Sequence, residues 1–175
     1  MKRYILTGAP GAGKTAVLRL LERDGLAVVE EAATDVIALA QAMGTPEPWT
    51  DPSFIDEIVA LQRQRQLRAV GDLVVFDRSP ACAWALAEFL GHPPSPTLRA
   101  EVDRVIRDRI YEPRVFFLES LGFVAPTTAR RIGFEESLAF EAVHAEAYRR
   151  FGYDLVRIPA AGVRARTEQI LRELS

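Results

Sequence analysis

Residues 8–15 read Gly8-Ala9-Pro10-Gly11-Ala12-Gly13-Lys14-Thr15, which fits the pattern G-x-x-x-x-G-K-[ST]. The apolar run 3–7 before it is typical of a strand, and residues 16–23 after it carry apolar side chains at helical spacing. A strand, a glycine-rich turn and a helix in this order predict a phosphate-binding P-loop. Its glycines let the backbone turn tightly, so that several N–H groups converge on one bound anion.

Each part of this loop has an expected role toward a nucleotide. Lys14 supplies a full positive charge to the β and γ phosphates, and the positive end of the following helix adds to that field. The Thr15 hydroxyl is placed to hold Mg²⁺. Lys2 is the only other lysine, and the chain otherwise uses arginine for positive charge. A lysine at position 14 therefore suits a site where a compact charge must reach a phosphate. The predicted nucleotide-binding residues are Gly8, Ala9, Pro10, Gly11, Ala12, Gly13, Lys14, Thr15 and Ala16.

The composition narrows the class of protein. A chain of 175 residues fits one domain, and we expect a single domain over 1–175. The net charge of −2 gives no basic field that would favour nucleic acid. One cysteine, Cys82, permits no internal disulfide, and no apolar run is long enough to span a membrane. The first strand begins almost at the N-terminus, leaving no room for a signal peptide, so we expect a cytoplasmic protein without membrane partners.

Five apolar strands are expected to alternate with helices along the chain. The expected strands are 3–7, 26–30, 73–76, 114–118 and 154–158, and the expected helices are 16–23, 32–43, 53–70, 80–90, 97–110, 134–151 and 163–174. The proline-rich segment 45–52 is expected to be a loop. Because hairpin turn signals are lacking, the pattern predicts a parallel sheet covered by helices on both faces, a three-layer α/β domain. The second strand is expected to be buried.

Asp77 and Arg78 follow the third strand, where a parallel sheet places its ligands. Asp77 is placed to orient Mg²⁺, directly or through water. The alternative role for Asp77 is a helix N-cap, although Ser79 has the better spacing for a cap. Arg78 is placed to clamp a phosphate, and its alternative is a surface salt bridge.

Glu30 and Glu31 end the second strand. A carboxylate at this point faces the γ-phosphate across the cleft and could accept a proton from an acceptor hydroxyl. In the alternative interpretation, both are solvated acids favoured by the dipole of the next helix. We assign the catalytic role to Glu31 and leave Glu30 as the second candidate.

Arg130 and Arg131 lie in the segment 119–133, which has no helical or strand periodicity. Two neighbouring guanidiniums suit a lid that closes on transferring phosphates, in the manner of an arginine finger supplied by the same chain. In the alternative interpretation they are surface charges flanking a helix. We predict a lid over 119–133 with both arginines as catalytic residues.

The long helix after the proline-rich loop has an apolar stripe that passes through Gln62 and Gln66. Amides on such a stripe need partners, either a polar ligand or the solvent along an exposed helix face. Trp49 is interpreted as a core residue, with stacking on a flat substrate as its alternative. His92 and His144 are assigned no role, and no His/Cys spacing indicates a transition-metal site.

Several of these motifs resemble known families. Gly8-Ala9-Pro10-Gly11-Ala12-Gly13-Lys14 resembles the P-loop of nucleoside monophosphate kinases, and Asp77-Arg78-Ser79 resembles the Asp-Arg motif after their third strand. The chain as a whole is similar to the AAA-type ATPase domain group that contains ribosylnicotinamide-kinase-like proteins. The segments that carry this similarity are Val28-Val29-Glu30-Glu31-Ala32-Ala33, Phe76-Asp77-Arg78-Ser79-Pro80 and Arg130-Arg131-Ile132-Gly133-Phe134-Glu135.

The resemblance implies a kinase-like strand order, 2-3-1-4-5, with the first and third strands adjacent. It also implies that Glu31 is a base or a substrate ligand. The chain departs from hydrolysis-driven AAA machines because no Asp-Glu pair ends its third strand.

Three classes of function follow from these residues. The expected one is an ATP- (or GTP-) and Mg²⁺-dependent small-molecule kinase that transfers the γ-phosphate to a nucleoside- or nucleotide-like acceptor. The alternative is a regulatory ATPase or GTPase switch acting through a protein partner, although Glu119-Ser120-Leu121-Gly122 is not a guanine-recognition motif. A nucleic-acid-processing ATPase is disfavoured by the net charge. The identity of the acceptor, the preference for ATP or GTP and the oligomeric state stay open.

Overall fold

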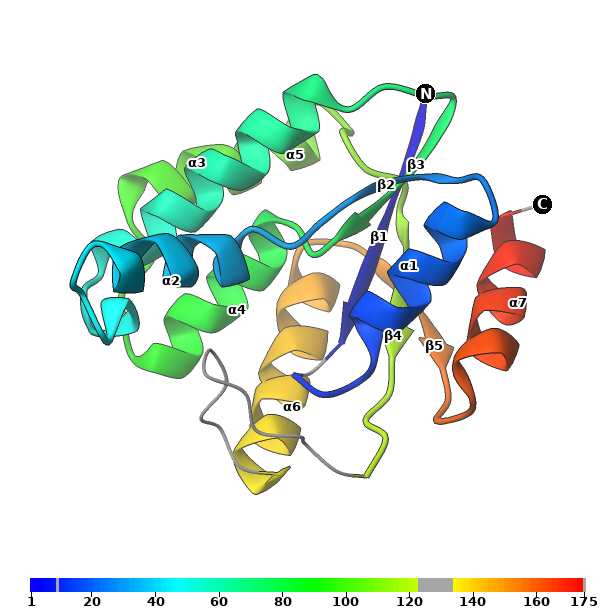
Figure 1. The fold of residues 1–175 in the computed structure, drawn as a ribbon. Coiled ribbons are helices and arrows are strands. Elements are labelled where there is room, and N and C mark those ends of the chain that lie inside the picture. The colour runs from blue at the N-terminus through cyan, green and yellow to red at the C-terminus, as the bar shows by residue number, and fades with distance from the viewer. Residues whose placement is uncertain (9, 123–133, 175) are drawn as a thin grey trace.

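A computed structural model of the chain describes residues 1–8, 10–122 and 134–174 (Figure 1). The strands are β1 (Lys2–Gly8), β2 (Ala27–Val29), β3 (Leu73–Asp77), β4 (Arg114–Leu118) and β5 (Asp154–Ile158). The helices are α1 (Lys14–Arg23), α2 (Ala33–Ala42), α3 (Ser53–Arg68), α4 (Pro80–Leu90), α5 (Pro96–Arg107), α6 (Phe134–Arg150) and α7 (Val163–Leu174), with a short 3₁₀ helix η1 (Pro48–Thr50).

The five strands form one parallel sheet in the order β2-β3-β1-β4-β5, so the predicted strand order is confirmed. β1 lies in the centre, and its Leu6 is in register with Asp77 of β3 and Phe116 of β4. The P-loop that follows β1 therefore emerges in the middle of the carboxyl edge, directly beside the end of β3.

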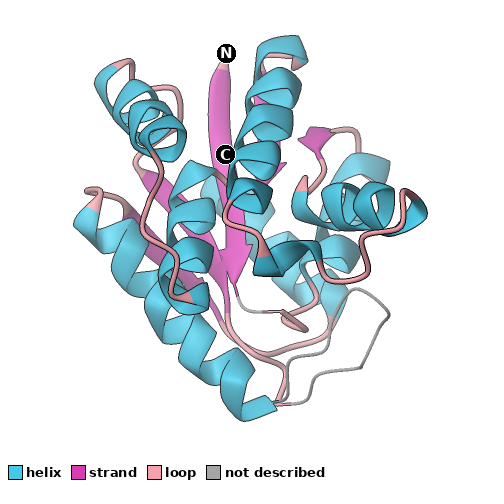
Figure 2. Ribbon diagram, turned by 90° about the vertical axis from the view of Figure 1, so that its left-hand side faces the viewer, coloured by secondary structure: helices cyan, strands magenta, loops and turns pink. Residues whose placement is uncertain are grey.

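Helices cover both faces of the sheet (Figure 1, Figure 2). On one face, Leu6 of β1 packs with Leu18 of α1 and Ile170 of α7 in one buried cluster. Because successive side chains alternate along a strand, Ile5 points to the other face. There it shares a second cluster with residues of α4, α5 and α6, including Tyr148. The predicted three-layer α/β architecture is confirmed.

A further apolar cluster, beside the sheet, is formed by the four helices α2, α3, α4 and α5. Val36 of α2, Ile58 of α3, Ala83 of α4 and Leu98 of α5 are buried in it. Trp49 packs against this cluster as a partly buried side chain, in agreement with its interpretation as a core residue. These helices therefore form one wall, which lies to one side of the sheet (Figure 1).

The structure corrects three local expectations. The proline-rich segment contains the 3₁₀ turn Pro48–Thr50, because proline is compatible with the first position of a helical turn, where its missing N–H is not needed. β2 is only half-buried and spans Ala27–Val29, since it is the edge strand and pairs with β3 alone. α5 ends at Arg107, because the backbone at Arg109 turns into the left-handed region with φ 47°.

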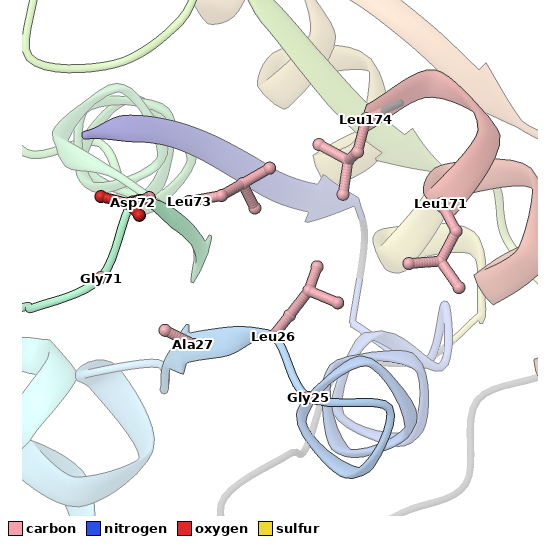
Figure 3. A pocket seen from close by; sticks show the side chains of 8 residues that line it. All are labelled: Gly25, Leu26, Ala27, Gly71, Asp72, Leu73, Leu171 and Leu174. Carbon is pink, nitrogen blue, oxygen red and sulfur yellow. The ribbon is translucent and has the colours of Figure 1, made fainter.

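At the opposite, amino end of the strands lies an open depression of about 390 Å³ (Figure 3). Its side chains are mainly apolar: Leu26 precedes β2, Leu73 begins β3, and Leu171 and Leu174 end α7. None of the predicted site residues lines it. Within the described parts of the chain, no helix combines the length and apolar character that crossing a membrane requires.

Candidate active site

The P-loop backbone depends on glycine at two positions. At Gly8, φ is 137°, and an added Cβ would collide with the carbonyl oxygen of Leu118 on the neighbouring strand. At Gly13, φ is 78°, and this left-handed residue is the N-cap from which α1 starts at Lys14. Side chains other than glycine rarely adopt these angles, so both positions require glycine. Ala9 lies outside the described residues.

Lys14 is folded back into the loop. Its side chain is only 6% exposed, and Nζ donates to the carbonyl oxygen of Gly8 at 3.0 Å. Burial lowers the pKa of Lys14 to about 8, and the nearby charge of Arg78 acts in the same direction. A phosphate group beside this ammonium would offset both effects. Thr15 and Ala16 are exposed in the first turn of α1, where the Thr15 hydroxyl is accessible to a ligand.

Two side chains outside the motif brace the P-loop. The Ser137 hydroxyl of α6 donates to the carbonyl oxygen of Pro10 at 2.9 Å. Arg166 of α7 is buried, and its Nη1 lies 3.2 Å from where a Cβ on Gly13 would be. Its Nη2 donates to the carbonyl oxygen of Glu119 at 3.4 Å, and burial lowers the pKa of this guanidinium. Neither residue was expected from the sequence.

Asp77 ends β3 beside the P-loop, as its position in the sequence predicted. Its carboxyl group is buried, and Oδ1 has no hydrogen-bond partner among the described residues. Burial raises the pKa of Asp77 to about 6, and the negative charge of Glu31 adds to this rise against the opposing charges of Lys14 and Arg78. A buried carboxylate oxygen without a partner is poised for a cation or a water molecule.

Arg78 adopts an unusual backbone for a residue with a side chain. Its φ is 75°, in the left-handed region, and its N–H donates to the carbonyl oxygen of Leu6 at 2.9 Å. The guanidinium is buried and forms an ion pair through Nε with Glu31. Nη1 donates to Sγ of Cys82 at 2.9 Å and lies 3.1 Å from Nε2 of His144. The guanidinium of Arg78 is therefore not a surface group, although its partner Glu31 is partly exposed, and the role of Arg78 as a phosphate clamp stays a prediction.

The structure separates the two glutamates that end β2. Glu31 pairs with Arg78 and accepts a hydrogen bond from the Thr34 hydroxyl at 2.9 Å. Burial alone would raise its pKa, but the charges of Arg78 and Lys14 outweigh burial and lower the pKa of Glu31 to about 2. Glu30 turns away and forms an exposed ion pair with Arg19. Only Glu31 joins the cluster that contains Lys14, Asp77 and Arg78.

Ser79 and His144 differ from their sequence-based expectations. Ser79 occupies the N-cap position of α4 but makes no side-chain capping bond, because its hydroxyl is hydrogen-bonded to the Tyr148 hydroxyl at 2.9 Å. His144, which was given no role, is fully buried in the cluster, and its Nε2 lies 2.7 Å from Sγ of Cys82. Tyr148, His144 and Cys82 thus join Ser137 and Arg166 as polar residues near the site that sequence reasoning missed.

Gln62 and Gln66 of α3 are buried, so the alternative of a solvated helix face is wrong for both. Gln66 accepts a hydrogen bond from Nη2 of Arg104 at 2.8 Å, which satisfies its amide oxygen within the protein. The amide oxygen of Gln62 has no partner among the described residues. Gln62 therefore stays a candidate for contact with a polar ligand, whereas Gln66 does not.

The predicted lid cannot be placed. Arg130 and Arg131 fall in 123–133, outside the described residues. Their catalytic role, the lid over 119–133 and a single domain over 1–175 stay predictions.

Magnesium would find oxygen ligands here that match its chemistry. Within 1–8, 10–122 and 134–174, no group of three or more His, Cys, Asp or Glu side chains could hold a metal ion. Mg²⁺ in nucleotide sites usually takes only one or two protein oxygens and completes its shell with phosphate and water. The unpartnered Oδ1 of Asp77 and the exposed hydroxyl of Thr15 fit that requirement.

A family model described as an AAA domain matches residues 3–166. The chain belongs to this AAA domain family. The predicted resemblance to the AAA-type ATPase domain group is thereby confirmed. None of the curated protein sequences compared with the chain matches it.

Solved structures with the same fold include three kinases. The deoxyadenosine kinase from M. mycoides with bound dCTP superposes with a TM-score of 0.63 at 17% identity, covering 99% of this chain and 98% of that one. The thymidylate kinase from Ehrlichia chaffeensis gives 0.63 at 14% identity, with complete coverage of both chains. The shikimate kinase from Acinetobacter baumannii gives 0.60 at 15%, covering 99% and 93%. At these identities the similarity establishes the P-loop kinase fold.

Proposed function

We propose that this protein is an ATP- and Mg²⁺-dependent kinase that transfers the γ-phosphate to a nucleoside- or nucleotide-like acceptor. The observation that carries the proposal is the ion pair of buried Arg78 with Glu31, which lies beside the ammonium of Lys14 at the carboxyl edge of the sheet. A carboxylate for the acceptor and a guanidinium for the transferred group are thus gathered next to a phosphate-binding loop. The kinase fold of the similar structures supports this reading of the site.

The P-loop side of the site suits a nucleoside triphosphate. Lys14 and the N-terminus of α1 supply positive charge for the β and γ phosphates, and this charge counts most as the γ-phosphoryl group leaves. Mg²⁺, when bound, would neutralise part of the charge on the phosphates. Thr15 and Asp77 are the residues proposed to hold it.

When substrates bind, Arg78 and Glu31 can take separate roles, Arg78 as the phosphate ligand and Glu31 as the base. Arg78 is charged and already desolvated, so the phosphoryl oxygens of a donor compete with Glu31 for its N–H groups. As the guanidinium turns to phosphate, the pKa of Glu31 rises from its low value, because the charge that lowered it is shared. Glu31 then accepts the proton of the acceptor hydroxyl, while the new O–P bond forms and the bond to the β-phosphate oxygen breaks, releasing ADP.

The acceptor is proposed to bind against the wall formed by α2, α3 and α4. Gln62 offers a buried amide oxygen without a partner among the described residues, which suits an N–H or O–H donor on the acceptor. The kinases of similar fold act on deoxyadenosine, thymidylate and shikimate, as their names state. A nucleoside-like acceptor agrees with a helix that presents a buried amide from an otherwise apolar stripe.

The test is a screen of nucleosides, nucleotides and sugars with ATP and Mg²⁺. ADP release is measured with and without each candidate, and mass spectrometry identifies a phosphorylated product. A kinase gives ADP release well above the background for one acceptor class, with one phosphate added to that acceptor. Equal ADP release with and without every acceptor contradicts transfer and favours the regulatory switch.

A further inference from the structure

α6 carries three polar side chains on its buried face. Ser137, His144 and Tyr148 are all fully buried, although all three have polar groups that need partners. Their spacings of seven and four residues place them on one side of the helix. This side faces the candidate active site.

Each of the three contacts a different part of the site. Ser137 donates to the P-loop at the Pro10 carbonyl, and Tyr148 is hydrogen-bonded to Ser79, which follows Arg78 in the chain. His144 lies between them, against the guanidinium of Arg78. One rigid helix therefore touches both the P-loop and the turn that carries Asp77 and Arg78.

The contact between His144 and Arg78 has one consistent arrangement of protons. Burial and the nearby charges of Arg78 and Lys14 lower the pKa of His144 far below its usual value, so the imidazole is neutral. Burial raises the pKa of the Cys82 thiol, so this group keeps its proton. With the imidazole proton on Nδ1, the single lone pair of Nε2 is shared between the Cys82 thiol at 2.7 Å and Arg78 Nη1 at 3.1 Å.

Arg78 is thereby held at two ends. Glu31, from the end of β2, binds Nε, while His144 of α6 and Cys82 of α4 bind Nη1. When a phosphate draws the guanidinium away from Glu31, the contacts at Nη1 are those that remain. They leave the side chain little freedom to rotate about its long axis.

We propose that His144 is a positioning residue that, together with Cys82, fixes the plane of the Arg78 guanidinium for phosphate. The proposal rests on the proposed function in one respect, the contact of Arg78 with the transferred phosphoryl group. His144 itself touches no substrate. It acts by keeping Arg78 from turning when its pairing with Glu31 loosens.

The activity test compares two substitutions of similar size. His144→Leu removes the acceptor at Nε2, and we expect kcat to fall roughly tenfold to a hundredfold, the scale of a small misplacement of a catalytic group, with KM for ATP little changed. His144→Gln restores a neutral polar side chain, and we expect it to recover much of the lost kcat. The matched control is Gln66→Leu, which removes an acceptor from another arginine, Arg104, and should leave kcat unchanged.

A second measurement does not depend on catalysis. With ¹³C- and ¹⁵N-labelled arginine, the Nη–H signals of a held guanidinium stay separate, because rotation about its C–N bonds is slow. The Arg78 signals are those that vanish in Arg78→Lys. We expect separate signals in the parent protein and in His144→Gln, and averaged signals in His144→Leu.

The outcomes separate this inference from the proposed function. If no acceptor is phosphorylated but the Arg78 signals are separate and average in His144→Leu, the proposed function fails and the positioning of Arg78 by His144 stands. If the parent protein is an active kinase but its Arg78 signals are already averaged, the positioning role is wrong. It is also wrong if His144→Leu keeps full kcat. Should His144→Leu not fold, the parent spectrum and the kcat of His144→Gln and Cys82→Ala decide in the same way.

Discussion

Two partly buried Arg–Glu pairs, Arg104–Glu101 and Arg78–Glu31, are built differently. Arg104 and Glu101 lie three residues apart on α5, with hydrogen bonds of 2.9 and 2.7 Å to the two carboxylate oxygens. Gln66 of α3 accepts a further hydrogen bond from Arg104. Arg78 and Glu31 come from different strand ends, and Arg78 has a left-handed backbone. The first pair is local and regular, and the second is long-range and strained.

The difference extends to the groups around each pair. Beside Arg78, the buried Oδ1 of Asp77 has no partner among the described residues, and Lys14 and Asp77 have strongly shifted pKa values. Strained backbone, unsatisfied buried atoms and shifted pKa values gather where a protein is prepared for a ligand. The Glu101–Arg104 pair, with its polar groups paired on one helix, connects α5 to α3. We infer that the cluster around Arg78 and Glu31 serves function and that the Glu101–Arg104 pair serves structure.

The largest expected effect concerns Lys14. Lys14→Ala removes the charge that meets the transferring phosphoryl group, so phosphoryl transfer should fall by a thousandfold or more, roughly the loss of one or more strong transition-state contacts. Lys2→Ala is the matched control, because Lys2 is the only other lysine and lies exposed at the start of β1. The measurement is kcat/KM with the identified acceptor. Undiminished turnover in Lys14→Ala would contradict the P-loop assignment.

The two arginines themselves give the next prediction. Arg78→Lys keeps the charge but loses the planar fork, so we expect kcat to fall on the order of a hundredfold. Arg104→Lys makes the same change in the structural pair, and we expect a lower melting temperature with kcat unchanged. Both variants are measured for kcat and for thermal unfolding. If Arg104→Lys lowers kcat as much as Arg78→Lys does, the division between a functional and a structural cluster is wrong.

The sequence predicts the fold well because the decisive signals are local. The glycine pattern at 8–15 and the alternation of short apolar strands with helices are readable within a few residues of each other. The rule that ligands gather at the carboxyl ends of parallel strands then brings Glu31, Asp77 and Arg78 to the P-loop, where the structure places them. The choice of Glu31 over Glu30 agrees with the geometry, because only Glu31 pairs with Arg78.

The missed residues come from contacts between distant segments. His144 contacts Arg78 from 66 residues away, and Ser79 meets Tyr148 across 69 residues. The sequence does carry a weak signal, since Ser137, His144 and Tyr148 repeat at helical spacing on one face of the helix. Without the packing of α6 on the sheet, nothing shows which groups these side chains meet. Gln66 and Arg104 are a second example, since only the crossing of α3 and α5 pairs them.

A smaller effect is expected at Asp77, where function and stability should move in opposite directions. Asp77→Asn should raise the Mg²⁺ concentration for half-maximal rate on the order of tenfold, because a hard oxygen ligand loses its charge. The folded state holds the proton of Asp77 more tightly than the unfolded chain does, so ionised Asp77 weakens folding as the pH rises from about 4 to about 6. At pH 7 Asp77→Asn should therefore melt a few degrees higher than the parent.

The comparison for Asp77 is a pair of melting curves at pH 4 and pH 7 without Mg²⁺. At pH 4 most of the gain should disappear, since Asp77 is then neutral in the folded parent protein. A lower melting temperature for Asp77→Asn at both pH values would mean that the ionised carboxylate stabilises the fold. The same result, joined to an unchanged Mg²⁺ titration, would assign Asp77 to the structural class.

The smallest expected effect is a pH dependence that only a prepared site should show. The pKa of Lys14 is about 8 in the ligand-free protein, so above pH 8 its ammonium loses a proton that a bound nucleotide needs. Nucleotide affinity should then weaken with rising pH, by roughly tenfold per pH unit at most. Stability should change with the opposite sign, because the unfolded chain holds this proton more tightly than the folded one. As the pH rises from 8 to 10, the titration of Lys14 therefore makes the ligand-free fold more stable while nucleotide binding weakens.

Calorimetry in two buffers of different ionisation enthalpy should detect proton uptake on nucleotide binding at pH 9, and Lys14→Met should abolish it. Uptake that persists in Lys14→Met would place the titrating group elsewhere and remove Lys14 from the set of groups prepared for phosphate.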